Sequence, residues 1–92
     1  MQFAKRLRPL VQSGEVTCSI RIWKQPRVKA GGRYPLPPGE IEVTSIRGLS
    51  RSQITTKLAR RSGFSSVEEL LQVAQHGKGD VIFLVEFVYH EP

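Results

Sequence analysis

The chain has very little cysteine and tryptophan, with one residue of each type among its 92 residues. A single cysteine, Cys18, cannot form a disulfide within the chain, and it cannot supply the pair of cysteines that a zinc finger uses to bind its metal. A disulfide scaffold and a zinc finger are therefore excluded. The chain also lacks an apolar run of membrane-spanning length, and its start, Met-Gln-Phe-Ala-Lys-Arg, is charged where a signal peptide would be apolar. We therefore expect a cytoplasmic protein without a membrane partner.

Acidic side chains are scarce in the first 33 residues, where Glu15 is the only one and eight lysines and arginines are present. This segment carries a formal charge of +7, whereas residues 34–92 carry −1, so the net charge of +6 arises in the first third of the chain. Charge confined to one segment focuses electrostatic potential and attracts polyanions, of which nucleic acid is the commonest. A membrane surface would require a longer basic amphipathic helix than residues 3–13 can form.

The length and the 39% hydrophobic composition suit a single domain over residues 1–92. Apolar residues at helical spacing, followed by Gly14, predict a helix over 3–13. Alternation with a period of two predicts a strand over 17–23, and the basic segment 24–33 after it predicts a loop.

The second half of the chain predicts a hairpin, two helices and a long strand. The sequence Pro37-Pro38-Gly39 predicts a tight turn in which Gly39 has a positive φ, and a strand over 41–46 follows it. Capping-box spacing at residues 50 and 53, and again at 65 and 68, predicts helices that end at Gly63 and near Gly77. The run 81–89 predicts a buried central strand. The fold class is therefore α+β, a mixed sheet curled into a small barrel and flanked by about three short helices.

The strand over 17–23 carries the candidate site. Thr17, Ser19, Arg21 and Trp23 share one of its faces, while Cys18 points to the apolar face as a buried structural thiol. A guanidinium can make two parallel hydrogen bonds to a phosphate or stack on a base, and an indole can stack on any base. Lysines can bind the phosphate backbone of a nucleic acid. The predicted RNA- or nucleotide-binding residues are Lys5, Arg6, Thr17, Ser19, Arg21, Trp23, Lys24, Arg27 and Lys29.

A less specific interpretation of the same strand is a solvated face with Trp23 folded onto the outside of the barrel. Arg60 and Arg61 lie in the last turn of a predicted helix, where positive charge is favoured without any ligand. His76 and His90 have no second ligand at metal-ligand spacing, so we expect neither a metal nor another cofactor. Nothing in the composition calls for an oligomer, and we expect a monomer.

Several short blocks distributed over nearly the whole chain resemble one family. They are Phe3 and Arg6 before a short helix, Gly14, Thr17-Cys18-Ser19-Ile20-Arg21, Val28-Lys29-Ala30-Gly31, Ile41-Glu42-Val43-Thr44 and Phe83-Leu84-Val85-Glu86-Phe87. In these blocks the chain resembles an ASCH domain, a family of the PUA-like β-barrel superfamily. The resemblance implies a small barrel with flanking helices and a role in RNA metabolism.

One branch of that family hydrolyses the acetyl amide of N4-acetylcytidine with a lysine, a threonine and a glutamate. Counted from the motif glycine, Gly14, the lysine position holds Val16 and the threonine position holds Ser19. A gapless alignment puts Gly63 or a neighbour at the glutamate position. Gly14 and Arg21 match the family's residues, and Ser19 is a conservative replacement. The resemblance therefore implies that this chain has the family's binding cleft, but it does not imply the amidohydrolase reaction.

These observations favour an RNA- or nucleotide-binding module, with two alternatives. The first is an enzyme on RNA or modified nucleosides, a ribonuclease or an amidohydrolase. Its catalytic residues stay unassigned, with Ser19 as the one candidate, because a hydroxyl without a nearby base is a poor nucleophile. The second is a DNA-binding helix-turn-helix over 54–74, against which stand Glu68 and Glu69, two carboxylates where a recognition helix meets phosphates.

Overall fold

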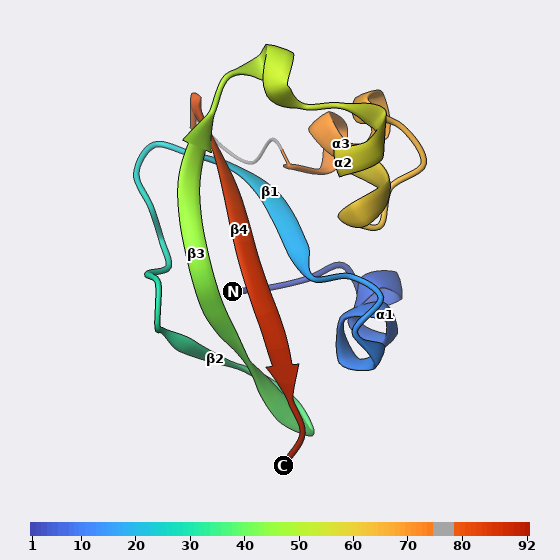
Figure 1. Ribbon diagram of the computed structural model, residues 1–92, viewed down its shortest axis with the longest axis vertical. Helices are drawn as coiled ribbons and strands as arrows, with labels where there is room; N and C mark the ends of the chain where they lie inside the picture. Colours follow the sequence, from blue (N-terminus) through green and yellow to red (C-terminus); the bar gives the residue numbers. More distant parts are fainter. Residues whose placement is uncertain (75–78) are drawn as a thin grey trace.

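The computed structural model describes residues 1–74 and 79–92. Its elements, in chain order, are a 3-10 turn η1 (Lys5–Leu7), α1 (Arg8–Ser13), β1 (Cys18–Trp23), β2 (Arg33–Leu36), β3 (Gly39–Leu49), a 3-10 turn η2 (Arg51–Gln53), α2 (Thr56–Arg61), α3 (Val67–Ala74) and β4 (Val81–His90). In the view of Figure 1 the three α-helices are to the right of the strands, α2 and α3 beside the upper half of the curled sheet and α1 beside its lower half. The predicted end of the third helix near Gly77 lies outside the described residues.

The four strands form one sheet in the order β1-β4-β3-β2, and every neighbouring pair is antiparallel. The prediction of mixed strand directions is corrected: the sheet is a curled half-barrel of antiparallel strands. The reason is that β4, the last strand, inserts between β1 and β3 and runs opposite to both, so these two mutually parallel strands never pair. The predicted α+β class with about three short helices is confirmed.

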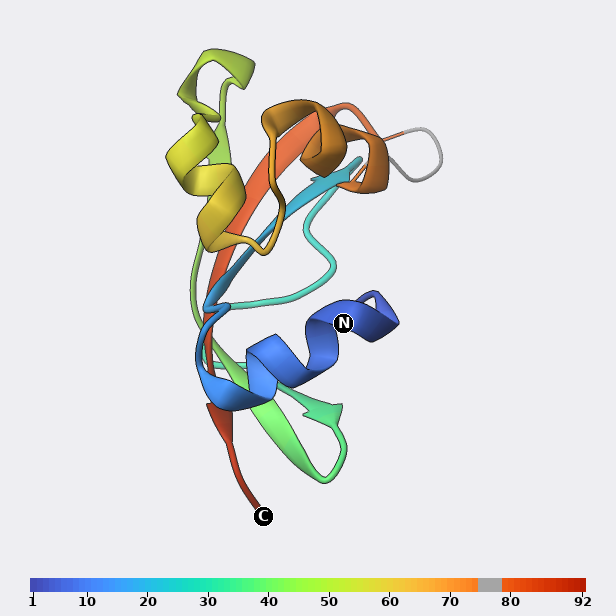
Figure 2. The same ribbon diagram turned by 90° about the vertical axis from the view of Figure 1, so that its right-hand side faces the viewer.

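The curl of the sheet is concentrated in its two long strands. The register between β3 and β4 shifts between Val43 and Ser45, which leaves Thr44 as an extra residue on β3. Such a bulge bends a strand and increases its twist. In the perpendicular view of Figure 2, β3 and β4 bend along their length and the helices lie in front of the curved sheet.

The hairpin between β2 and β3 differs from the prediction at its turn. Leu36 pairs with Gly39, so the loop consists of Pro37 and Pro38, which are joined by a cis peptide bond. Gly39 does not have the predicted positive φ. A Cβ there would lie 2.1 Å from the carbonyl oxygen of His90, so it is close packing against β4 that requires the glycine.

The helix predicted to start at the capping box of residues 50 and 53 and to end at Gly63 is two shorter elements. The capping box of Ser50 and Gln53 is present, but it closes only the single turn η2. Ile54 is extended and buried, and Thr55 then starts α2 by accepting a hydrogen bond at Oγ1 from the Leu58 backbone N–H at 3.1 Å. The chain is interrupted because a second N-cap follows the first within five residues.

The opening helix also begins later than predicted. Residues 5–7 form the 3-10 turn, and α1 starts at Arg8, so Pro9 lies in the first turn where its missing N–H leaves no hydrogen bond unmade. Gly14 ends α1 as predicted, with a left-handed φ of 85°. Among the described helices, none is both long and apolar enough to cross a membrane.

Two clusters of buried side chains lie on opposite faces of the sheet. Leu84 belongs to one cluster and Val85 to the other, and consecutive residues of a strand point to opposite faces. We call the face of Leu84 and Cys18, which α2 and α3 cover, the Cys18 face. The face of Val85 and Arg21, against which residues 1–13 and the loop after β1 pack, is the Arg21 face. The candidate site lies on this second face and extends around the edge strand β1 to α3.

Candidate functional site

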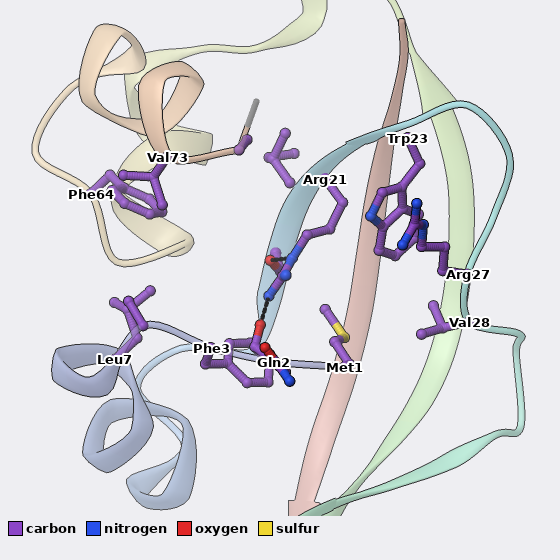
Figure 3. Close-up of a pocket in the computed structure, with 14 residues that line it drawn as sticks. Met1, Gln2, Phe3, Leu7, Arg21, Trp23, Arg27, Val28, Phe64 and Val73 are labelled. Carbon is purple, nitrogen blue, oxygen red and sulfur yellow. Dashed lines mark hydrogen bonds between the residues drawn. The ribbon is translucent and has the colours of Figure 1, made fainter. Parts of the chain in front are cut away.

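A cavity of about 640 Å³ lies between the N-terminal segment, β1, the loop after β1 and α3. Its polar side chains include Ser19, Arg21 and Arg27, and its aromatic side chains are Phe3, Trp23 and Phe64. No aspartate or glutamate belongs to the described residues that line it. Figure 3 shows Arg21 reaching from β1 toward the N-terminal segment, while Trp23 and Arg27 line the end of the pocket away from Leu7 and Phe64.

Arg21 is the central polar group of this pocket. Its Nε donates to Ser19 Oγ at 2.8 Å, and one terminal nitrogen donates to the backbone carbonyl of Gln2 at 2.5 Å. The guanidinium carbon also lies 5.2 Å from the centre of the Phe3 ring, within cation–π range. Burial lowers the pKa of Arg21 below its ordinary value. The side chain is therefore held at three points.

None of the three partners of Arg21 carries a negative charge. Among the residues that the structure describes, no carboxylate forms an ion pair with it. A half-buried cation that meets only neutral partners keeps its full attraction for an anion, because the low surrounding dielectric screens the charge weakly. The pocket is thus preorganised for an anionic group at Arg21.

Trp23 and Arg27 form the open end of the pocket. Trp23 is half-buried and packs against the buried cluster that contains Val85, while Arg27 is exposed and makes no hydrogen bond or ion pair to another described residue. At this end the pocket thus offers an apolar indole plane and a guanidinium that has no ionic partner among the described residues. That combination suits a planar, negatively charged ligand such as a nucleotide.

The hydroxyl of Ser19 accepts a hydrogen bond from Arg21 and can donate one to a ligand. Its oxygen accepts the Arg21 hydrogen bond, and Arg21 is the only ionisable side chain hydrogen-bonded to it in residues 1–74 and 79–92. A guanidinium stays protonated and cannot remove the serine proton. The hydroxyl hydrogen is consequently left to donate to a ligand that already contacts Arg21.

The two other positions of the family's amidohydrolase set serve core packing. Val16 is 4% exposed and belongs to the buried cluster that contains Val85. A Cβ on Gly63 would lie 2.5 Å from Leu7 Cδ2 and 3.2 Å from Val16 Cγ2, and Gly63 has a left-handed φ of 93°. Neither a lysine at the first position nor a glutamate at the second fits without moving the core.

The structure brings together four of the nine predicted binding residues. Ser19, Arg21, Trp23 and Arg27 line the pocket. Of the remaining five, four are exposed and lie outside its lining: Lys5, Thr17, Lys24 and Lys29.

The fifth, Arg6, is engaged elsewhere. One of its terminal nitrogens donates to the Gly63 carbonyl and the other to Glu69 Oε1, each at 3.0 Å. Its guanidinium carbon lies 5.0 Å from the Phe64 ring centre. Arg6 therefore ties η1 to the start of α3.

Sequence reasoning missed three contributors to the pocket. Phe3 supports Arg21 and packs edge-to-face on Phe87 with ring centres 5.3 Å apart, so its helical spacing revealed only a core role. Phe64 comes from the turn between α2 and α3, and its position after Gly63 is the one signal available. The carbonyl of Gln2 is a backbone group, which no side-chain pattern reveals.

The remaining candidates outside the pocket have structural partners. Cys18 is buried as predicted, burial raises the pKa of its thiol, and its sulfur lies 3.6 Å from Ser62 Oγ. His90 Nε2 lies 2.8 Å from Glu42 Oε1, at the far end of the sheet. His76 falls outside the described residues.

Comparison of the chain with protein-family models, with curated proteins and with solved structures gives no match. Whatever is inferred about its activity therefore depends on the sequence and on the pocket itself.

Proposed function

We propose that the chain is an ASCH-like module of the PUA-like class that binds RNA or a nucleotide in the pocket on the Arg21 face. The observation that carries this proposal is Arg21 itself, a half-buried cation held by Ser19, Gln2 and Phe3 with no carboxylate partner among the described residues. Proteins seldom bury a charge without an opposite one, unless a ligand supplies it.

The pocket's other groups match the parts of a nucleotide. A phosphate placed at Arg21 would accept from its guanidinium and from the Ser19 hydroxyl, which are already hydrogen-bonded to each other. The base would stack on the indole of Trp23, and Arg27, which lines the same pocket, would contact a neighbouring phosphate. A cavity of about 640 Å³ lies within the usual range for small-ligand sites.

The assignment to an ASCH-like class rests on the sequence blocks given above. The curled sheet with helices beside it is compatible with part of a PUA-like barrel. The packing roles of Val16 and Gly63 favour ligand binding over N4-acetylcytidine hydrolysis.

The test is a titration monitored by the fluorescence of Trp23, the only tryptophan, with single-stranded RNA, duplex DNA and free cytidine at two salt concentrations. We expect saturable quenching by RNA and an affinity that falls steeply at the higher salt concentration, as counterion release requires. If none of the three ligands changes the fluorescence of Trp23, the proposal is contradicted.

Two variants connect the signal to the pocket. Arg21→Ala should weaken RNA binding by tenfold or more, because it removes a charged hydrogen-bond donor from the phosphate. Arg60→Ala removes an exposed charge from the last turn of α2 and should have little effect. Equal losses in the two variants would show that RNA meets a diffuse basic surface and that the pocket assignment is wrong.

A further inference from the structure

Phe83 lies next to the pocket without belonging to the core. It pairs with Arg21 across β1 and β4, so its side chain is on the Arg21 face. Its ring centre is 5.9 Å from that of Trp23, with the two planes tilted by 40°. Phe83 is half-buried, and it is a member of neither buried cluster nor of the side chains packed against them. Core packing therefore does not account for this ring.

The strand on the other side of Phe83 leaves the ring uncovered. Gly48 of β3 is the residue opposite Phe83, and cross-strand partners project to the same face. A Cβ on Gly48 would have Ile82 O, at 3.9 Å, as its only neighbour within 4 Å among the described atoms. A β-branched residue at this position would cover part of the ring, and glycine leaves that space open.

The aromatic surface thus continues past the pocket. Trp23 lines the cavity and its ring is also near that of Phe83, which is not part of the lining, and Val81, 39% exposed, pairs with Trp23 on the same face. The residue that follows Trp23 is Lys24, exposed like Arg27, so two exposed cations lie within four residues of Trp23 along the chain. Adjacent stacking surfaces with cations along one edge are typical of proteins that bind single strands.

We propose that Phe83 is a second base-stacking position and that the ligand is single-stranded RNA of at least two nucleotides. One nucleotide enters the pocket, and its neighbour stacks on Phe83 beyond Trp23. This inference depends on the proposed function, because it extends the same site. It predicts that an oligonucleotide binds more tightly than a mononucleotide, and that the difference depends on Phe83.

The experiment measures both ligands on the same variants. Fluorescence anisotropy of a labelled RNA hexamer gives one affinity, and competition by uridine 5′-monophosphate gives the other. In Phe83→Ala, the affinity for the hexamer should fall about tenfold, which is within the range for removal of one stacked base, while that for the mononucleotide stays unchanged.

Two further variants complete the test. Gly48→Val places a side chain in open space over the ring and should reproduce the selective loss with Phe83 still present. Val88→Ala is the control, since Val88 is on the same strand, 41% exposed and on the Cys18 face, and it should bind both ligands as the wild type does.

The outcomes separate the two proposals. If the wild type binds neither ligand, both proposals fail. If it binds both and Phe83→Ala binds the hexamer as tightly as the wild type, the second stacking position is wrong and the pocket stands. An equal loss for hexamer and mononucleotide would also overturn the inference, because Phe83 would then act only by supporting Trp23.

Discussion

Arg21 and Arg33 are two arginines on the same small sheet, and their surroundings are opposite. Arg33 is exposed on β2, where its terminal nitrogens lie 2.8 Å from Glu40 and 3.5 Å from Glu42. Glu42 in turn meets His90 at 2.8 Å. Arg21 is half-buried on β1 and meets a hydroxyl, a carbonyl and an aromatic ring. One arginine is neutralised in solvent, and the other retains its charge in a pocket.

The comparison shows that the local charge of the first third of the chain is not a map of the binding surface. Both arginines contribute equally to the formal charge of +7 over residues 1–33. The fold then brings acids from β3 to Arg33, because β2 and β3 pair, and brings Glu69 to Arg6. Arg21 receives no acid among the described residues. Three predictions sharpen or break this contrast.

The largest expected effect is on stability, from removal of the ring beneath Arg21. Phe3 is 6% exposed and packs against Phe87, so Phe3→Ala should lower the free energy of unfolding by about 3–5 kcal/mol in a urea titration. Tyr34, the half-buried aromatic residue beside Arg33 in sequence, is the matched position. Tyr34→Ala should be less destabilising, because less of its ring is removed from water. Equal losses would show that residues 1–4 are not anchored through Phe3.

The second effect is on binding and its salt dependence. Arg21→Gln keeps a polar side chain but removes the charge, and we expect RNA affinity to fall about 10- to 100-fold, as for a lost charged hydrogen bond. The slope of log affinity against log salt should become shallower by about 0.7, the value for one phosphate contact on a single strand. Arg33→Gln should change neither quantity. A similar loss in the Arg33 variant would place RNA on the hairpin of β2 and β3 as well.

The smallest effect concerns the paired region and pH. The hydrogen bond with His90 lowers the pKa of Glu42, and Arg33 contributes in the same direction. A carboxylate with a lowered folded pKa stabilises the protein above its unfolded pKa and loses that contribution as the pH falls through the folded value. Glu42→Gln should therefore be slightly less stable than the wild type at neutral pH, and the two should converge in acid.

Urea titrations of both proteins between pH 7 and pH 3 measure this convergence, and added salt should shrink the difference at neutral pH, because the partners are exposed to solvent. A gap between the two proteins that does not change with pH would mean that Glu42 acts through packing and not through its charge.

Much of the local structure was accessible from the sequence. Gly14 at the end of α1, the capping box at Ser50 and the alternation that buries Cys18 each depend on residues within a few positions of one another. Such patterns are decided by backbone geometry and local hydrogen bonds, which adjacent side chains determine. The positions that failed, Gly39 and Ile54, are those where contact with a distant strand or with the core overrides local turn and helix signals.

The candidate site was accessible only in part, for the same reason. The row on β1 correctly placed Ser19, Arg21 and Trp23 on one face because a strand alternates with period two. No pattern among neighbouring residues indicated that β4 would place Phe83 opposite Arg21 or that Phe64 would line the pocket. Nor did one indicate that Glu69 would form an ion pair with Arg6. Glu69 is 63 residues from Arg6 in the sequence, and Phe83 comes from another strand than Arg21.

By itself, the sequence determined the α+β composition, the segments that form strands and short helices, the buried face of β1 and an excess of positive charge in the first third of the chain. Each of these follows from side chains that act through the backbone next to them. Only the tertiary structure decided which of those charges keep their attraction for an anion. Whether a cation is neutralised depends on the carboxylates that distant segments bring within about 4 Å, and that distance is set by strand order and packing.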